Sequence, residues 1–181
     1  GRFAPEKGLH DLIKAFKTLH TIQRLVIVGD ADHETNYSRT LRKMASEDGR
    51  VLLTGYLSGE PLNQIFTNAS LFVLPSYHEG FPLVLLEALS YGLPVLASDI
   101  QANKEVELPA ERYFRCGDVV ELKCKMEALM EKFLSKEERQ TVQKQLTVKY
   151  DWENIAHETM KVYEEVLSKN STHRNHMFSC L

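Results

Sequence analysis

Apolar residues along the chain follow two alternating patterns. Over residues 8–20 they recur every three or four positions, as Leu9, Leu12 and Phe16 illustrate, and this spacing predicts a helix. Further helices are predicted over residues 35–48, 61–68 and 82–91. Short unbroken apolar runs lie between them and predict strands over residues 25–28, 51–54, 71–74 and 95–97, most of them closed by glycine or proline.

The alternation of strands and helices predicts the fold class. Strands whose residues are apolar in unbroken succession are typical of a parallel sheet that helices cover on both faces. We therefore predict an α/β fold with an open, doubly wound, Rossmann-like sheet.

The pattern changes after Gly117, where only helices are predicted. Asp118 is a suitable N-cap for a helix that runs to about residue 134, and a further helix and a last one over residues 152–167 follow. The remaining tail is polar and lacks periodicity, so we expect it to be mobile. The expected organisation is one domain over residues 1–168 and a tail over residues 169–181.

Composition and charge restrict the classes of protein open to this chain. Its 181 residues, of which 43% are hydrophobic and 26% charged, suffice for one domain with a core but not for two catalytic domains. Acidic and basic residues are mixed to a net charge of -3, so no basic stripe points to nucleic acid. The three cysteines form no C-x-x-C pair, and no apolar run approaches the roughly 20 residues of a membrane span. We expect reduced thiols and a cytoplasmic protein.

The loop after residues 71–74 is the most informative segment, because ligands of doubly wound sheets sit at the carboxyl ends of the strands. Pro82 suits the first position of the following helix, since its fixed φ is already helical. Gly80 lacks a Cβ and lets the backbone approach a ligand closely. The start of this helix is expected to present free N–H groups that favour negative charge.

Two carboxylates flank that helix start. Glu79 and Glu87 could accept hydrogen bonds from the hydroxyl groups of a sugar. The alternative is that both are solvated surface residues. Glu87 lies within an almost wholly apolar segment, which predicts a mostly buried carboxylate that needs polar partners.

Several segments resemble one family of enzymes. The run H-E-G-F-P-L-V-L-L-E-A-L-S-Y-G-L-P-V-L-A-S-D resembles the E-x(7)-E region of glycosyltransferase family 4, with Glu79 and Glu87 at its acidic positions. The opening G-R-F-A-P-E-K-G is similar to the G-R-x(4)-K-G segment of that family, with Arg2 and Lys7 at its basic positions. The phrases L-V-I-V-G-D, L-T-G-Y-L and D-W-E-N-I-A extend the resemblance to about residue 167. It implies the C-terminal, donor-binding half of a GT-B glycosyltransferase.

The resemblance also implies a role for each matching residue. Arg2 and Lys7 would grip the donor diphosphate, Glu79 would contact the donor sugar, and these three are the catalytic candidates. Glu87 would accept hydrogen bonds from the ribose. The main chain near Tyr56 and Leu57 would face the base, and the backbone after Glu79 would meet sugar or phosphate oxygens. The complete set implied at the donor is Arg2, Lys7, Tyr56, Leu57, Glu79, Gly80, Phe81, Pro82, Leu83 and Glu87.

Some positions depart from the family or stay open. The loop Gly29, Asp30, Ala31 has alanine where relatives often have a second glycine. Asp30 and Asp32 form a D-x-D triplet, but its place after a buried strand favours chance, so we expect no metal and no cofactor. His78 could touch a phosphate or be merely solvated. Glu105 fits an acidic position whose role the sequence leaves open.

The expected function is that of a retaining transferase, hexosyltransferase-type within EC 2.4. A sugar from a UDP- or GDP-type donor would pass to an acceptor held by the protein's own N-terminal domain, which is expected to be missing here together with the first strand. The chain alone is then expected to be inactive. Lipid-linked acceptors would bring the complete protein to a membrane through that domain. The alternatives are a non-enzymatic nucleotide-sugar-binding module and an enzyme similar to the sugar-nucleotide epimerases of GT-B type.

Overall fold

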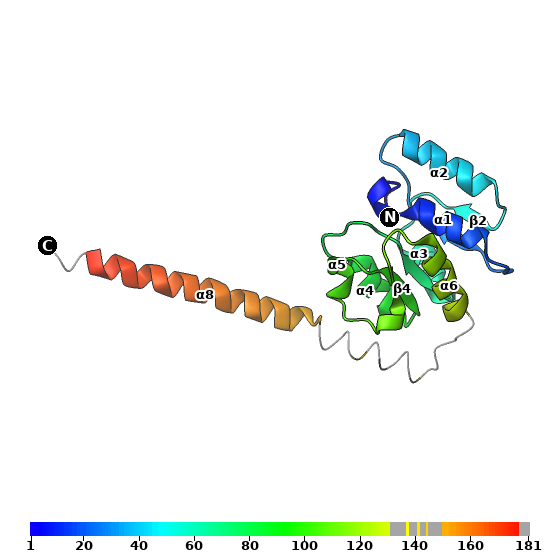
Figure 1. Ribbon diagram of the computed structural model, residues 1–181. Coiled ribbons are helices and arrows are strands. Elements are labelled where there is room, and N and C mark those ends of the chain that lie inside the picture. The colour runs from blue at the N-terminus through cyan, green and yellow to red at the C-terminus, as the bar shows by residue number, and fades with distance from the viewer. Residues whose placement is uncertain (131–136, 138–140, 142–143, 145–149, 178–181) are drawn as a thin grey trace. The chain divides into compact units, whose positions relative to one another are not determined.

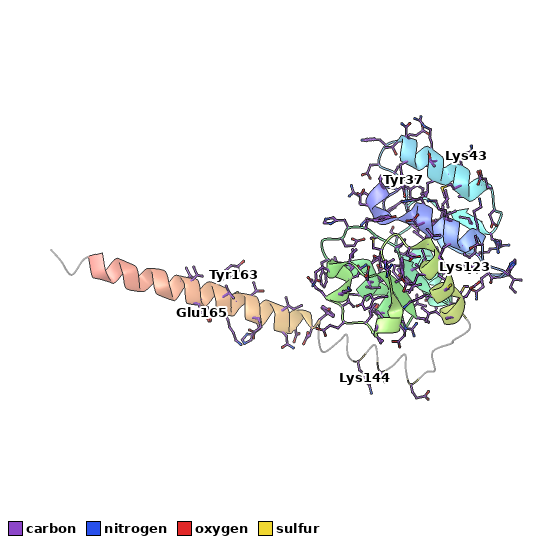
Figure 2. The ribbon with its side chains drawn as sticks, in the orientation of Figure 1. Tyr37, Lys43, Lys123, Lys144, Tyr163 and Glu165 are labelled. Carbon is purple, nitrogen blue, oxygen red and sulfur yellow. The ribbon has the colours of Figure 1, made fainter. Side chains whose placement is uncertain are left out.

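The computed structural model describes residues 1–130, 137, 141, 144 and 150–177. The chain divides into two compact units, Gly1–Val142 and Gln143–Leu181 (Figure 1). The second unit contains the helix α8, Trp152–Met177, from which Tyr163 and Glu165 project (Figure 2). None of the described helices combines the length and apolar character that crossing a bilayer requires.

The first unit alternates short strands with helices, as the sequence predicts. In chain order its elements are η1 Pro5–Lys7, α1 Leu9–Lys17, β1 Leu25–Ile27, α2 Asn36–Ser46, β2 Val51–Leu53, α3 Glu60–Asn68, β3 Phe72–Leu74, α4 Leu83–Ser90, β4 Val95–Ser98, α5 Gln101–Lys104, η2 Ala110–Arg112, β5 Tyr113–Phe114 and α6 Val119–Met130. The predicted α/β class with parallel strands is confirmed. The sequence did not predict η1, α5, η2 or β5.

The strands form two parallel ladders. β1 pairs with β2, with Val26 opposite Leu52, and β3, β4 and β5 pair in that order. An open sheet was expected, but no described strand joins β1 to β3. Among the described residues, one edge of β1 and one edge of β3 therefore have no strand partner.

Helices cover both faces of the strands. A core cluster joins buried residues of α1, α2 and α6 to strand residues such as Ile27, Val51 and Leu96. α4 contacts β3 and β4 through residues outside that cluster, so it covers the opposite face. The loops after β1 and β3 are linked by the opening segment, because Phe3 N–H donates to Asp30 O and Glu6 O accepts from Tyr77 N–H.

The predictions for the carboxyl-terminal segment fall only in part on residues that the structure describes. α6 is described to Met130, short of the expected end near residue 134, because the next residues lie outside the described part. The bounds of the further helix expected there also lie outside it, although Glu137, Thr141 and Lys144 are helical. α8 continues past residue 167, where the sequence placed its end. The domain boundary at residue 168 and the mobility of the tail stay predictions.

Candidate functional site

A tight turn brings the first basic motif to the end of β3. Gly8 follows η1 with φ of 61°, and a Cβ at this position would lie 2.0 Å from the carbonyl oxygen of Pro75. Only glycine allows this close approach without a shift of the backbone. The consequence is that Lys7, the residue before it, lies beside the loop that follows β3.

Lys7 and Glu79 form the centre of the candidate site. The Lys7 Nζ lies 2.9 Å from Glu79 Oε1 and 3.0 Å from Oε2, and the two side chains are 24% and 11% exposed. Ser76 donates a hydrogen bond of 2.6 Å to the same carboxylate. The Lys7 ammonium has three N–H donors, and the carboxylate occupies at most two of them. At least one donor remains for a ligand.

Buried polar residues of β4 and α5 support Ser76 through hydrogen bonds. Ser98 donates its hydroxyl to the carbonyl oxygen of Ser76, and both residues are fully buried. Asn103 in turn donates to Ser98 Oγ at 3.0 Å. Ser98 and Asn103 thus hold the backbone of Ser76 in place, and the hydroxyl of Ser76 donates to the carboxylate of Glu79.

The loop after β3 is also tied to α1. The hydroxyl of Tyr77 donates to the buried carboxylate of Asp11, and its backbone N–H donates to Glu6 O at 2.8 Å. The ring stacks on His10 with centroids 6.0 Å apart. The hydrogen bond to Asp11, together with burial, raises the pKa of Tyr77 to about 12. Tyr77 is therefore a neutral anchor at physiological pH.

The start of α4 differs from the prediction in two ways. Pro82 is the buried N-cap rather than the first helical residue, and the helix begins at Leu83. The N–H of Leu83 donates to Phe81 O and that of Leu85 to Pro82 O, each at 2.9 Å. These two donors are used within the turn, so the helix start offers fewer N–H groups to a ligand than we expected.

The prediction that Glu87 is mostly buried is wrong. Glu87 is exposed, whereas Leu85, Ala88 and Leu89 form the buried side of α4. A helix separates neighbours in sequence onto different faces, so the apolar residues around Glu87 do not enclose it. Glu87 instead lines a cavity, together with Val84.

One cavity of about 1460 Å³ collects most of the predicted site residues. The predicted residues that line it are Arg2, Lys7, Tyr56, Leu57, Glu79 and Glu87. The others lie outside its lining, and they are Gly80, Phe81, Pro82 and Leu83. Positive charges near the amino end and acidic side chains around α4 therefore line the same cavity, which also extends along β1 and β3.

The two aspartates that follow β1 each form an ion pair with an arginine. Arg2 is exposed, and its Nη1 lies 3.6 Å from Asp32. Asp30 accepts a hydrogen bond from Arg42 at 2.5 Å, and the bond from the Ala31 N–H lowers the pKa of Asp30. Within the described part of the chain, no group of three or more His, Cys, Asp or Glu side chains could hold a metal ion. The D-x-D carboxylates thus face different arginines.

The remaining candidates, His78 and Glu105, lie outside the lining of the cavity. His78 is exposed, and its N–H donates to Glu6 O at 3.4 Å. Glu105 caps the end of α5, outside the cavity lining. Sequence reasoning missed Gly8 and Ser76. Ser76 lies just beyond the end of a buried strand, the position at which ligands of this fold class gather, and that was the available signal.

The chain matches a family of known proteins over most of its length. Residues 1–164 match the family described as Glycosyl transferases group 1. Sulfoquinovosyl transferase SQD2 of Arabidopsis thaliana is 29% identical over an alignment of 158 residues, and the match covers 84% of this chain and 30% of that protein.

Solved structures share the fold. Sucrose-phosphate synthase from Thermosynechococcus elongatus has a TM-score of 0.75 at 26% identity, and the match covers 93% of this chain and 44% of that one. Anabaena HepE in complex with UDP-glucose has a TM-score of 0.79 at 21% identity, covering 91% of this chain and 47% of that one. The chain spans less than half the length of each of these proteins.

Proposed function

The chain belongs to the Glycosyl transferases group 1 family, and we propose that it forms the C-terminal, donor-binding half of a retaining enzyme of glycosyltransferase family 4. In this proposal a hexosyl group passes from a UDP- or GDP-type donor to an acceptor held by an N-terminal domain of the same protein. The structural neighbour from Anabaena binds UDP-glucose, which supports a nucleotide-sugar donor.

The pairing of Lys7 with Glu79 in the lining of the cavity carries the proposal. Lys7 retains a free donor beside a carboxylate whose position is fixed by Ser76. Arg2 lines the same cavity and is exposed, so its guanidinium can turn to a bidentate oxyanion. Both cations would stabilise the nucleoside diphosphate as the bond to the sugar breaks and negative charge develops on it.

The acidic residues suit the polyhydroxyl parts of the donor. Glu79 would accept a hydrogen bond from a sugar hydroxyl, and Glu87, exposed on the cavity side of α4, would accept from the ribose. The backbone at Tyr56 and Leu57 would face the base. This division of roles needs no metal, because Arg2 and Lys7 supply the positive charge.

Two further parts of the proposal concern the complete protein. It acts in the cytoplasm, where nucleotide sugars are the donors, and lipid-linked acceptors would bring it to a membrane through the N-terminal domain. The chain alone binds the donor weakly and transfers no sugar, because the groups that hold the acceptor belong to the other domain.

A screen of donors tests the proposal. UDP, GDP and ADP sugars are added to the chain, and the midpoint of thermal unfolding is measured, since a ligand that binds the native state raises it. One nucleotide class should raise the midpoint in a concentration-dependent way. No shift with any class at millimolar concentration would contradict a donor site.

A substitution then locates the donor in the cavity. Glu87→Ala should weaken binding of the selected donor by about 1 to 3 kcal/mol, as expected for lost hydrogen bonds to a charged group. The matched control is Glu47→Ala, which removes a carboxylate at the end of α2, outside the cavity lining. Calorimetric titration that gives equal dissociation constants for both variants would remove Glu87 from the site.

A further inference from the structure

The helices α3 and α4 meet around the side chain of Tyr91, the residue that caps α4. Its ring stacks on the ring of Phe66 in α3, with centroids 5.0 Å apart and planes inclined by 15°. Phe66 is buried and packs in turn against Phe72 of β3, with centroids 6.1 Å apart. These ring contacts fix the position of the Tyr91 hydroxyl.

The Tyr91 hydroxyl orients the amide of Asn63. It donates a hydrogen bond of 2.8 Å to Asn63 Oδ1. A phenolic hydroxyl has one hydrogen to donate, and the carbonyl oxygen of the amide is the group that accepts it. The amide is planar, so holding its oxygen at Tyr91 also determines the side on which its NH₂ group lies.

The NH₂ group of Asn63 is available to a ligand. The two other amide side chains of α3 donate within the helix, Gln64 to Glu60 Oε1 at 3.2 Å and Asn68 to Gln64 O at 2.8 Å. The NH₂ group of Asn63 has no acceptor among the described residues. Asn63 is exposed and lines the cavity. It therefore offers N–H donors to a molecule bound there.

Glu87 lies on the same side of α4 as Tyr91. The N–H of Tyr91 donates to Glu87 O at 3.3 Å, and residues four positions apart share one face of a helix. Helical side chains lean toward the preceding turn, so Tyr91 leans toward Glu87. Glu87 and Asn63 both line the cavity. A carboxylate that only accepts hydrogen bonds and an amide group that donates them thus face one ligand.

The start of α3 ties Asn63 to the part of the cavity assigned to the base. Gly59 is the N-cap of α3, and its carbonyl oxygen accepts from the Asn63 N–H at 3.0 Å. The loop that ends at Gly59 contains Tyr56 and Leu57, whose main chain faces the base in the proposed function. Asn63 is thus connected to this loop through Gly59 and to the helix of Glu87 through Tyr91.

The edge of the base determines what an N–H donor can recognise. Uracil and guanine present a keto oxygen, which accepts hydrogen bonds, whereas adenine presents an amino group at the corresponding position, which donates them. Two donors that face each other form no hydrogen bond. Building on the proposed function, we propose that Asn63 donates to the keto oxygen of the base and so selects uracil or guanine over adenine.

Tyr91 is a positioning residue in this proposal. It holds the amide oxygen of Asn63, so the NH₂ group faces the base. Without the Tyr91 hydroxyl the amide can turn by half a rotation and present its oxygen, which would accept from the amino group of adenine. Selectivity for a keto base therefore depends on both side chains.

Calorimetric titration of UDP, GDP and ADP tests the assignment. The readout is the dissociation constant of ADP divided by that of the tighter of UDP and GDP. The proteins are the wild type, Asn63→Asp, Tyr91→Phe and the control Asn36→Asp, which makes the same change at the start of α2, outside the cavity lining. An added negative charge weakens every nucleoside diphosphate, and the ratio removes this common effect.

The wild type should have a ratio of about ten or more. Asn63→Asp should lower the ratio by about tenfold, because a carboxylate accepts from the amino group of adenine and repels a keto oxygen. Tyr91→Phe keeps the ring stack on Phe66 and should lower the ratio by a smaller factor. Asn36→Asp should leave the ratio of the wild type unchanged.

The results separate this inference from the proposed function. A wild-type ratio of one or less, or an unchanged ratio in Asn63→Asp, overturns the role of Asn63 and leaves a donor site in place. A wild type that binds none of the three nucleotides at millimolar concentration contradicts the donor site, and the role of Asn63 with it. Thermal unfolding midpoints equal to that of the wild type verify that each variant is folded.

Discussion

The ion pair of Lys7 and Glu79 allows a quantitative test of the site geometry. Its side chains are 24% and 11% exposed, and the ammonium lies within 3.0 Å of both carboxylate oxygens. Exposed pairs contribute about 0 to 1 kcal/mol, and breaking a fully buried pair costs about 3 to 5 kcal/mol. For this partly buried pair we expect a coupling energy of about 1 to 2 kcal/mol, between those limits.

A double-mutant cycle measures that energy. Lys7→Met, Glu79→Gln and the double variant are unfolded in urea, and the coupling is the departure of their free energies of unfolding from additivity. The matched control is the pair of Arg39 and Glu34, which is separated by 3.4 Å and more than half exposed on both sides. Its coupling should stay below about 0.5 kcal/mol. A coupling for Lys7 and Glu79 no larger than the control would refute the geometry described here.

Three further predictions concern the anchors of the site and its chemistry. The hydrogen bond to Asp11 raises the pKa of Tyr77 to about 12, so this bond stabilises the fold fully below pH about 10 and loses its effect as the pH rises through about 12. Tyr77→Phe should therefore lose less stability than the wild type over that pH range. Equal losses of the two proteins in urea unfolding would count against this hydrogen bond. Gly8→Ala, with a Cβ only 2.0 Å from Pro75 O, should lower the free energy of unfolding by more than about 1 kcal/mol, whereas Gly80→Ala, with nothing within 4 Å, should change it by less than about 0.5 kcal/mol. A chelator should leave the dissociation constant of the donor unchanged in calorimetry, and a marked weakening would point to a metal.

The order of strands and helices could be predicted because parallel strands covered on both faces are apolar throughout. β1, β2 and β3 have this property, β4 has it except at Ser98, and each was expected within two residues of its observed bounds. β5 has only two residues and offers no periodicity to detect. The separation of the strands into two ladders was not predicted, because pairing depends on neighbours in space.

The site was predictable in its members but not in its contacts. Lys7 and Glu79 are 72 residues apart, and they are brought together by the close approach at Gly8 and by the hydrogen bond from Tyr77 N–H to Glu6 O. Glu87 was expected to be buried because its sequence neighbours are apolar, but α4 turns those neighbours to another face. The resemblance therefore identified most of the residues that line the cavity. The structure showed in addition that Ser76 and other groups orient the carboxylate of Glu79.

The central claim is that the cavity holds the diphosphate of a nucleotide sugar against Lys7, and one calorimetric comparison tests it most directly. The nucleoside diphosphate selected by the screen is titrated into the wild type, Lys7→Met and Lys43→Met, the last removing an exposed cation of α2 that lies outside the cavity lining. Loss of a charge-assisted hydrogen bond should raise the dissociation constant of Lys7→Met by about tenfold or more and leave that of Lys43→Met unchanged. Equal dissociation constants for all three proteins would contradict the account.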